Sequence, residues 1–130
     1  MDAPPKSILI VDDEPQLLKM MGLYLRRQGY NVLTFDSTDR AWAETGPIAG
    51  EIAVAVLDGS MEGLASEEMG VRLLHANPAL FVVMASGYPV DMTPLEAAGP
   101  GRVMFLHKPF AADKLALVIR RMLGAEEEGI

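Results

Sequence analysis

The sequence contains no cysteine, which excludes disulfide bonds and thiolate metal sites and fits a reducing compartment. It also lacks any apolar run close to the roughly 20 residues that a helix needs to span a bilayer. The opening residues MDAPPKS have no apolar core of the kind found in signal peptides. We therefore expect a cytoplasmic protein without membrane contact.

Basic residues are scarce relative to acidic ones. The chain has 11 Lys and Arg against 18 Asp and Glu, which gives a formal net charge of −7. Binding to a nucleic-acid backbone or an anionic membrane requires clustered positive charge, so the composition argues against direct nucleic-acid binding. Half of the residues are apolar and 22% are charged, which is typical of a globular protein.

The chain shows no internal repeat, no linker and no second zone of composition. Its 130 residues suffice for one compact domain and are too few for two. We predict one domain over residues 1–124, followed by a short, frayed acidic tail at 125–130. The sequence leaves open whether this domain stands alone or was excised from a longer protein.

Strand-like and helix-like patterns alternate along the chain. Apolar runs predict five strands, at residues 8–11, 31–35, 52–57, 80–85 and 103–106. Helices are predicted from Pro15 to a stop at Gly29, from Ser37 or Thr38 to Gly46, and at about 66–76, 91–98 and 112–123. The helix at 91–98 is expected to be weak because Gly and Pro residues surround it.

This alternation predicts the α/β class: a single three-layer (βα)5 domain with a parallel five-stranded sheet and right-handed crossovers. In the flavodoxin-like strand order 2-1-3-4-5, the order reverses between the first and third strands. Ligands of such sheets bind in the crevice at that reversal, beyond the carboxyl ends of the strands.

Polar residues directly follow four of the predicted strands: Asp12–Asp13, Asp58, Ser86 and Lys108. Because the carboxyl ends of parallel strands meet at one edge of the sheet, we expect these side chains to converge. Three carboxylates, a hydroxyl and an ammonium suit a divalent cation and a phosphoryl group. All-oxygen ligands favour Mg²⁺ or Mn²⁺ over zinc. Asp58 is then the expected phosphoryl acceptor, because the cation and Lys108 offset its repulsion from an anionic donor.

Four motifs, ILIVDDE, VLDGSM, MASGY and FLHKPF, occur in this order and span nearly the whole chain. In these motifs the sequence resembles the receiver domain of two-component response regulators. The resemblance implies that Asp58 is the phosphoacceptor. It also implies a Mg²⁺ site formed by Asp58 together with Asp12, Asp13 and the main-chain carbonyl of Ser60.

The resemblance also implies roles for residues at the last two strands. Ser86 would be the hydroxyl that moves toward the phosphoryl group. Phe105 would be the aromatic switch that turns inward on activation. The Lys108–Pro109 peptide bond would be cis, which X-Pro chemistry permits at modest cost.

A receiver domain implies a signalling module that catalyses only its own phosphotransfer and dephosphorylation. The phosphoryl donor would be a sensor histidine kinase or a histidine phosphotransfer protein. Phosphorylation would change the 90–123 face, which would contact the downstream protein. The domain would act as a monomer or as a phosphorylation-linked dimer.

The loop after Asp58 departs from the family pattern. Glu62 stands where the family usually has proline, and Ser66 where it usually has glycine. Because glycine widens backbone freedom, Gly59 and Gly63 predict a less constrained loop. These departures keep open the alternative of a phosphorylation-incompetent pseudo-receiver that acts as a protein-interaction module.

Two other classes are disfavoured by the residues at the strand ends. A phosphatase of the haloacid-dehalogenase type needs a second aspartate two residues after the nucleophile, and Ser60 stands at that position. A flavin-binding domain of this architecture would need a hydroxyl-rich phosphate loop after the first strand. The sequence has the acidic segment VDDEPQ there.

Overall fold

The computed structural model describes residues 6–128 and places five parallel strands in one sheet. The strands are β1 (Ser7–Val11), β2 (Asn31–Phe35), β3 (Ile52–Asp58), β4 (Phe81–Ser86) and β5 (Val103–His107). Their order is β2-β1-β3-β4-β5, so the predicted α/β class and strand order are confirmed.

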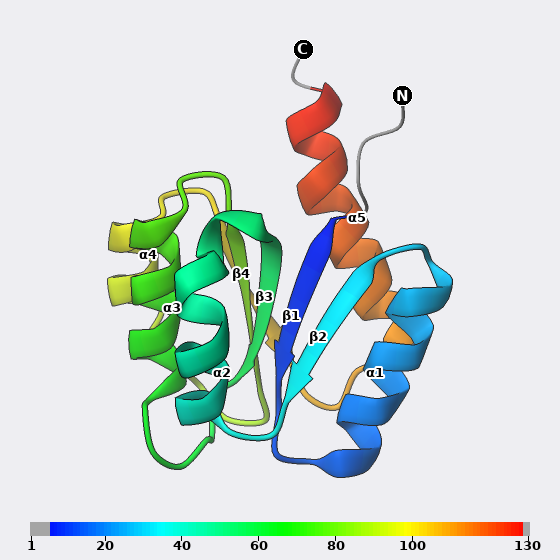
Figure 1. Ribbon diagram of the computed structural model, residues 1–130, viewed down its shortest axis with the longest axis horizontal. Helices are drawn as coiled ribbons and strands as arrows, with labels where there is room; N and C mark the ends of the chain where they lie inside the picture. Colours follow the sequence, from blue (N-terminus) through cyan, green and yellow to red (C-terminus); the bar gives the residue numbers. More distant parts are fainter. Residues whose placement is uncertain (1–5, 129–130) are drawn as a thin grey trace.

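Helices cover both faces of this sheet (Figure 1). They are α1 (Pro15–Arg27), α2 (Thr38–Thr45), α3 (Ser66–Ala76), α4 (Thr93–Ala98) and α5 (Ala112–Glu128), with a 3-10 helix η1 (Gly46–Glu51) after α2. Helices α1 and α5 form one outer layer, and α2, α3 and α4 form the other. Among the described residues, no helix is long and apolar enough to cross a membrane.

Local signals account for where the first two helices begin and end. Pro15 opens α1, where its missing N–H costs nothing. Gly29 follows α1 with a φ of 98°, in the left-handed region that favours glycine. Ser37 caps α2 because its hydroxyl accepts the Arg40 N–H at 3.3 Å.

Alternate side chains of β1 supply two separate cores. Ile8 and Ile10 pack toward α1 and α5, whereas Leu9 and Val11 pack toward α2, α3 and α4. All four are fully buried, as expected for the centre of a parallel sheet. The strand is therefore held on both faces, and it fixes the position of the residue that follows it, Asp12.

Some element bounds differ from the prediction. Strand β3 continues through Asp58, because Asp58 pairs with Ala85 of β4 and the Gly59 N–H donates to the Ala85 carbonyl at 2.9 Å. Helix α5 extends to Glu128 rather than ending at Leu123. It thus includes part of the expected tail, whose last residues, 129–130, lie outside the described residues. Helix α4 has only six residues, in line with the weak helical pattern.

The Arg102 side chain joins the ends of two helices to the sheet. Its guanidinium donates to the carbonyls of Asn77 at 2.9 Å and Leu80 at 2.8 Å. It also reaches the carbonyls of Leu74 at 3.2 Å and Ala98 at 3.5 Å. These carbonyls lie at the C-terminal ends of α3 and α4 or just before β4, where a positive charge is favoured by the helix dipoles.

We expect Arg102→Ala to lower the free energy of unfolding by about 2 kcal/mol, because several carbonyls lose their charged donor. Arg102→Lys should fall between wild type and Arg102→Ala, since one ammonium keeps the charge but cannot reach all four carbonyls. Urea unfolding of the three proteins measures both effects. An Arg102→Ala variant within about 0.5 kcal/mol of wild type would show that the contacts carry no net stability.

Candidate acidic site at the carboxyl edge of the sheet

The polar residues after the strands do meet at one edge of the sheet. Asp12 follows β1, Asp58 ends β3, Ser86 ends β4 and Lys108 follows β5. Asp12 and Asp58 are each 2% exposed and Ser86 is 1% exposed. Buried carboxylates need a charged or hydrogen-bonding partner, so their burial marks this edge as a site.

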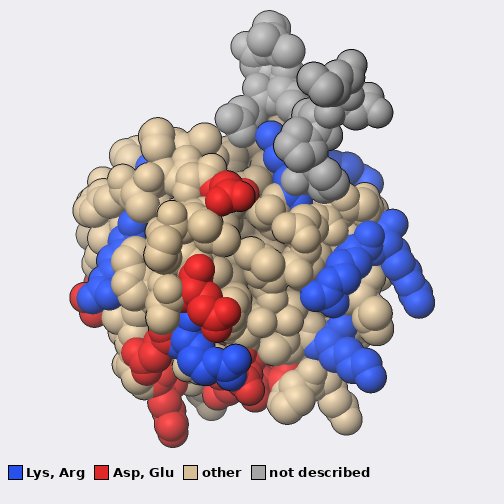
Figure 2. Space-filling model, viewed as in Figure 1, with Lys and Arg blue, Asp and Glu red and all other residues tan. Residues whose placement is uncertain are grey.

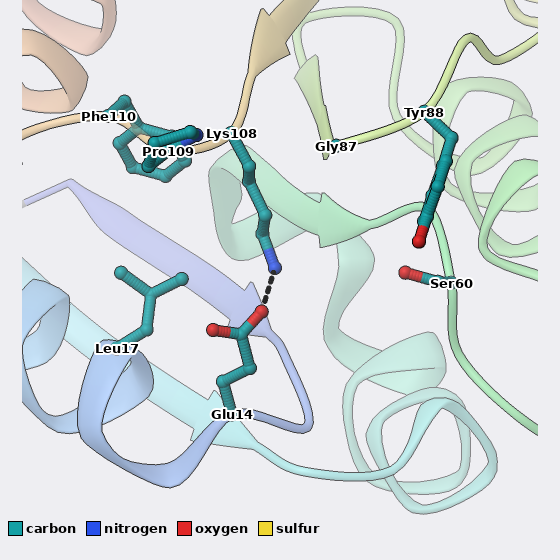
Figure 3. A pocket seen from close by; sticks show the side chains of 8 residues that line it. All are labelled: Glu14, Leu17, Ser60, Gly87, Tyr88, Lys108, Pro109 and Phe110. Carbon is teal, nitrogen blue, oxygen red and sulfur yellow. Dashed lines mark hydrogen bonds and ion pairs between the residues drawn. The ribbon is translucent and has the colours of Figure 1, made fainter.

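Lys108 is the partner that these carboxylates share. Its ammonium lies 2.9 Å from Asp12 Oδ2, 2.9 Å from Glu14 Oε1 and 3.5 Å from Asp58 Oδ2. Figure 3 shows the Lys108 side chain extending toward Glu14. The Lys108 backbone N–H also donates to the Ser86 carbonyl at 2.9 Å, which fixes the lysine relative to the end of β4.

Ser60 orients the Asp58 carboxylate. Both the backbone N–H and the hydroxyl of Ser60 donate to Asp58 Oδ1, each at 3.1 Å. The other oxygen, Oδ2, is thereby directed toward Lys108. The resemblance implied a role only for the main-chain carbonyl of Ser60, so these two donated hydrogen bonds are an additional role.

Burial and mutual repulsion shift the acid strengths in the site. Burial raises the pKa of Asp12, and this outweighs the hydrogen bonds from Lys108 and the Glu14 N–H, which act to lower it. Burial and repulsion from Asp58 raise the pKa of Asp13. For Lys108, burial acts to lower the pKa, but hydrogen bonds to Asp12 and Glu14 outweigh it and the pKa is raised.

A cation could be held by carboxylate oxygens at this edge. One oxygen from each of Asp12, Glu14 and Asp58 lies within 4.8 Å of the others, and such oxygens are the ligands that hard divalent cations prefer. Glu14 was missed because the sequence explains it fully as an acid at the start of a helix. Asp13 is exposed, and its carboxyl interacts with that of Asp58. The carboxylates therefore suit a metal ion.

Ser86 and Gly59 lie in close contact beside the end of β3. A Cβ built on Gly59 would lie 3.0 Å from Ser86 Cβ and 3.1 Å from Ser86 Oγ, so a side chain at position 59 would crowd the hydroxyl. Ser86 Oγ accepts the Tyr88 N–H at 3.0 Å. As an acceptor in that bond, the hydroxyl can still donate its own proton.

The remaining residues that the resemblance singled out, Phe105 and Pro109, lie in β5 and directly after Lys108. Phe105 is half-buried, and its ring meets that of His107 edge to face, with centroids 6.3 Å apart. The Lys108–Pro109 peptide bond is cis, as the resemblance implied. A surface hollow of about 470 Å³ opens over the site and is lined by Glu14, Leu17, Ser60, Gly87, Tyr88, Lys108, Pro109 and Phe110 (Figure 3).

A second hollow, lined in part by Asp13, Asp36, Asp39 and Glu62, lies beside the site. In Figure 2, acidic side chains gather toward the lower edge of the molecule, where the strands end in Figure 1. Basic side chains are more numerous over the side that carries α1. The carboxyl edge of the sheet therefore attracts cations.

The loop between β3 and α3 is more constrained than its glycines suggested. The Thr38 hydroxyl lies 2.6 Å from the Leu64 carbonyl and 3.2 Å from that of Glu62. Asp39 Oδ1 accepts the Leu64 N–H at 3.3 Å. At the far end of the loop, the Ser66 hydroxyl donates to the Asp58 carbonyl. The expectation of a less constrained loop is therefore wrong, because side chains from α2 and α3 hold it.

Asp58 is buried at the end of the central strand β3, and Lys108 and further acids surround it. This arrangement is that of a flavodoxin-like α/β domain with an acidic site where the strand order reverses. Over residues 8–120 the sequence matches the response regulator receiver domain, and the chain belongs to that family. Domains of this family are signalling domains that interact with histidine kinases. The identification made from the four motifs is confirmed.

The relatives and solved structures agree with this assignment. The chain is 35% identical to the nitrogen assimilation regulatory protein NtrX of Azorhizobium caulinodans, covering 90% of this chain and 26% of NtrX. It is 31% identical to the C4-dicarboxylate transport transcriptional regulatory protein DctD of Rhizobium meliloti, covering 98% of this chain and 26% of DctD. The chain thus spans about a quarter of these relatives.

Among solved structures, a CheY-like response regulator receiver domain protein from Methanospirillum hungatei matches with a TM-score of 0.82. That match covers 97% of this chain and 99% of the other at 23% identity, so it supports the fold.

Proposed function

We propose that Asp58 accepts a phosphoryl group from a sensor histidine kinase or a histidine phosphotransfer protein, in a reaction that depends on Mg²⁺. The observation that carries this proposal is the shared contact of Lys108 with Asp12, Glu14 and Asp58 at the open edge of the sheet. The ammonium already neutralises a buried acceptor carboxylate, and it can equally neutralise a phosphoryl oxygen attached to that carboxylate.

In the proposed transfer, a carboxylate oxygen of Asp58 forms a bond to phosphorus as the bond from phosphorus to the donor's histidine nitrogen breaks. The electron pair of the broken bond stays on the imidazole nitrogen. Ser60 keeps the acceptor carboxylate in place through its two hydrogen bonds, and Ser86 would donate its hydroxyl proton to a phosphoryl oxygen. Hydrolysis of the aspartyl phosphate by water would then return the domain to its resting state.

The metal ion would be held by the ligands that the resemblance implied, which are Asp12, Asp13, Asp58 and the main-chain carbonyl of Ser60. Glu14 would join them, because its carboxylate lies close to those of Asp12 and Asp58. Bound there, Mg²⁺ or Mn²⁺ would supply positive charge that lowers repulsion between Asp58 and an anionic phosphoryl donor. The preference for Mg²⁺ or Mn²⁺ over zinc comes from the carboxylates, because oxygen ligands bind these two cations more readily than they bind zinc.

The output would follow from movement of Ser86 toward the phosphoryl group, with Phe105 turning inward and the 90–123 face changing. The short helix α4 lies within that face. The domain would act in the cytoplasm on a downstream protein, as a monomer or a phosphorylation-linked dimer. Direct nucleic-acid contact by this domain is disfavoured by its net charge of −7.

Intact-protein mass after incubation with acetyl phosphate tests the proposal. We expect one added phosphoryl group in the presence of Mg²⁺ and none when the metal is chelated. The absence of an adduct on rapid sampling, together with no binding of beryllofluoride, would contradict the proposal. That outcome would favour the pseudo-receiver alternative, in which the Glu62 loop has disabled the site.

A further inference from the structure

The β3–α3 loop, residues 59–65, approaches the N-terminal end of α2. Thr38, the first residue of α2, is completely buried. Its hydroxyl has a single proton, and the 2.6 Å distance makes the Leu64 carbonyl the main acceptor, with the Glu62 carbonyl at 3.2 Å. A buried hydroxyl from α2 therefore holds the loop chiefly through the Leu64 carbonyl.

Asp39, the next residue of α2, holds the same loop from outside. Its Oδ1 accepts the Leu64 N–H at 3.3 Å, and its carboxylate lies directly against Gly63. Gly63 has a φ of 82°, which L side chains rarely adopt, and a Cβ there would collide with Asp39. The glycine thus allows the close approach that lets Asp39 reach Leu64.

The anchored loop is continuous with the acceptor. Ser60, the second loop residue, donates twice to Asp58 Oδ1, and its main-chain carbonyl is an expected metal ligand. At Glu62 this chain lacks the proline that would stiffen the loop in the family pattern. The contacts from α2 fall on Glu62 and on the two residues that follow it.

We propose that Thr38, assisted by Asp39, is a positioning residue for the phosphoacceptor site, doing through hydrogen bonds what the missing proline would do through its ring. The inference rests on the proposed function, because its consequence is a correctly placed Ser60 and Asp58. Without the Thr38 hydroxyl, the loop would sample more conformations and hold a metal ion less well.

The chain provides a matched control on the same helix. Thr45 is 1% exposed, and its hydroxyl also donates to a carbonyl at 2.6 Å, that of Ala41. Thr38→Val and Thr45→Val therefore each remove one buried hydroxyl of equal hydrogen-bond length from α2. Of these two hydroxyls, only that of Thr38 hydrogen-bonds to the loop. A general weakening of α2 would instead affect both variants alike.

The experiment measures Mg²⁺ binding by calorimetry and the exchange rate of the Leu64 amide in the metal-free protein. Thr38→Val should bind Mg²⁺ on the order of tenfold more weakly than wild type, with faster Leu64 exchange. Thr45→Val should match wild type in both, and Thr38→Ser should restore both because it keeps the hydroxyl.

Equal Mg²⁺ affinity in Thr38→Val and wild type would overturn the inference, and so would an equal loss in Thr45→Val. If wild type takes up a phosphoryl group with Mg²⁺ and Thr38→Val binds Mg²⁺ as tightly as wild type, only the positioning role is contradicted. Wild type that binds no Mg²⁺ and forms no adduct would overturn both.

Discussion

The Asp58→Asn variant should form no phosphoryl adduct, and its metal-free form should be more stable than wild type by about 1 kcal/mol. The asparagine side chain has no carboxylate oxygen that could form an acyl phosphate. It also removes one of the charges that raise the pKa of Asp12 and Asp13. Lys108 keeps its two shorter contacts, to Asp12 and Glu14 at 2.9 Å, and loses only the 3.5 Å contact.

The pH dependence follows from the direction of these shifts. A carboxyl whose pKa is raised by folding binds its proton more tightly in the folded state. Asp12 and Asp13 therefore oppose folding when they are ionised, and their penalty is relieved as the pH falls through their raised pKa values toward the ordinary 3.8. In Asp58→Asn, acidification should raise the free energy of unfolding by less than in wild type. The reason is that Asp12 and Asp13 are no longer repelled by a charge at position 58.

Urea unfolding between pH 4 and 8, with and without Mg²⁺, measures these effects. Mg²⁺ at ten times its dissociation constant should stabilise wild type by about 1.4 kcal/mol, and Asp58→Asn much less. Asp113→Asn, at an exposed acid in the first turn of α5, is the control for loss of one negative charge. A metal-free Asp58→Asn less stable than wild type would show that its contact with Lys108 outweighs the repulsion.

Much of this arrangement could be predicted because its signals are local. Each strand is a short apolar run, and the polar residue that ends it sits at the same edge once the strands are parallel. Asp12, Asp58, Ser86 and Lys108 therefore meet as expected. The order of the strands decides which of them are neighbours, and the alternation of strands and helices favours that order.

The contacts that complete the site have no local signal. Glu14 reads as an ordinary acid at a helix start, yet it bonds Lys108, which lies 94 residues away in sequence. Thr38 is the first residue of α2, yet its hydroxyl donates to the carbonyl of Leu64 in the β3–α3 loop, which lies 26 residues later in the sequence. Such pairs depend on how the layers pack, and no periodicity or composition specifies them.

The loop after Asp58 is held by contacts of the same long-range kind. In an isolated peptide, the glycines at 59 and 63 would widen the range of backbone conformations of this loop. In the folded protein, Gly63 is what permits the close approach of Asp39. A residue that loosens the unfolded chain therefore helps to fix the folded loop.

Lys108→Met should slow phosphoryl uptake from acetyl phosphate by on the order of 100-fold, because the charge facing the transferred group is lost. It should also lower metal-free stability by about 3 kcal/mol, since buried Asp12 and Asp58 lose the only cationic side chain within 4 Å of them among the described residues. Methionine roughly preserves the length of the side chain, so the change is chiefly one of charge.

The pH profile separates lost charge from lost packing in this variant. The pKa of Lys108 is raised above its ordinary 10.5, so its stabilisation is fully present below pH 10.5 and is lost only as the pH rises through the higher folded value. The deficit of Lys108→Met should therefore be steady from pH 7 to 10 and shrink in acid as Asp12 takes up a proton. Mg²⁺ should restore more stability to the variant than to wild type. A deficit unchanged by acid and by Mg²⁺ would mean that the lysine acts through the packing of its stem, and the electrostatic account of the site would fail with it.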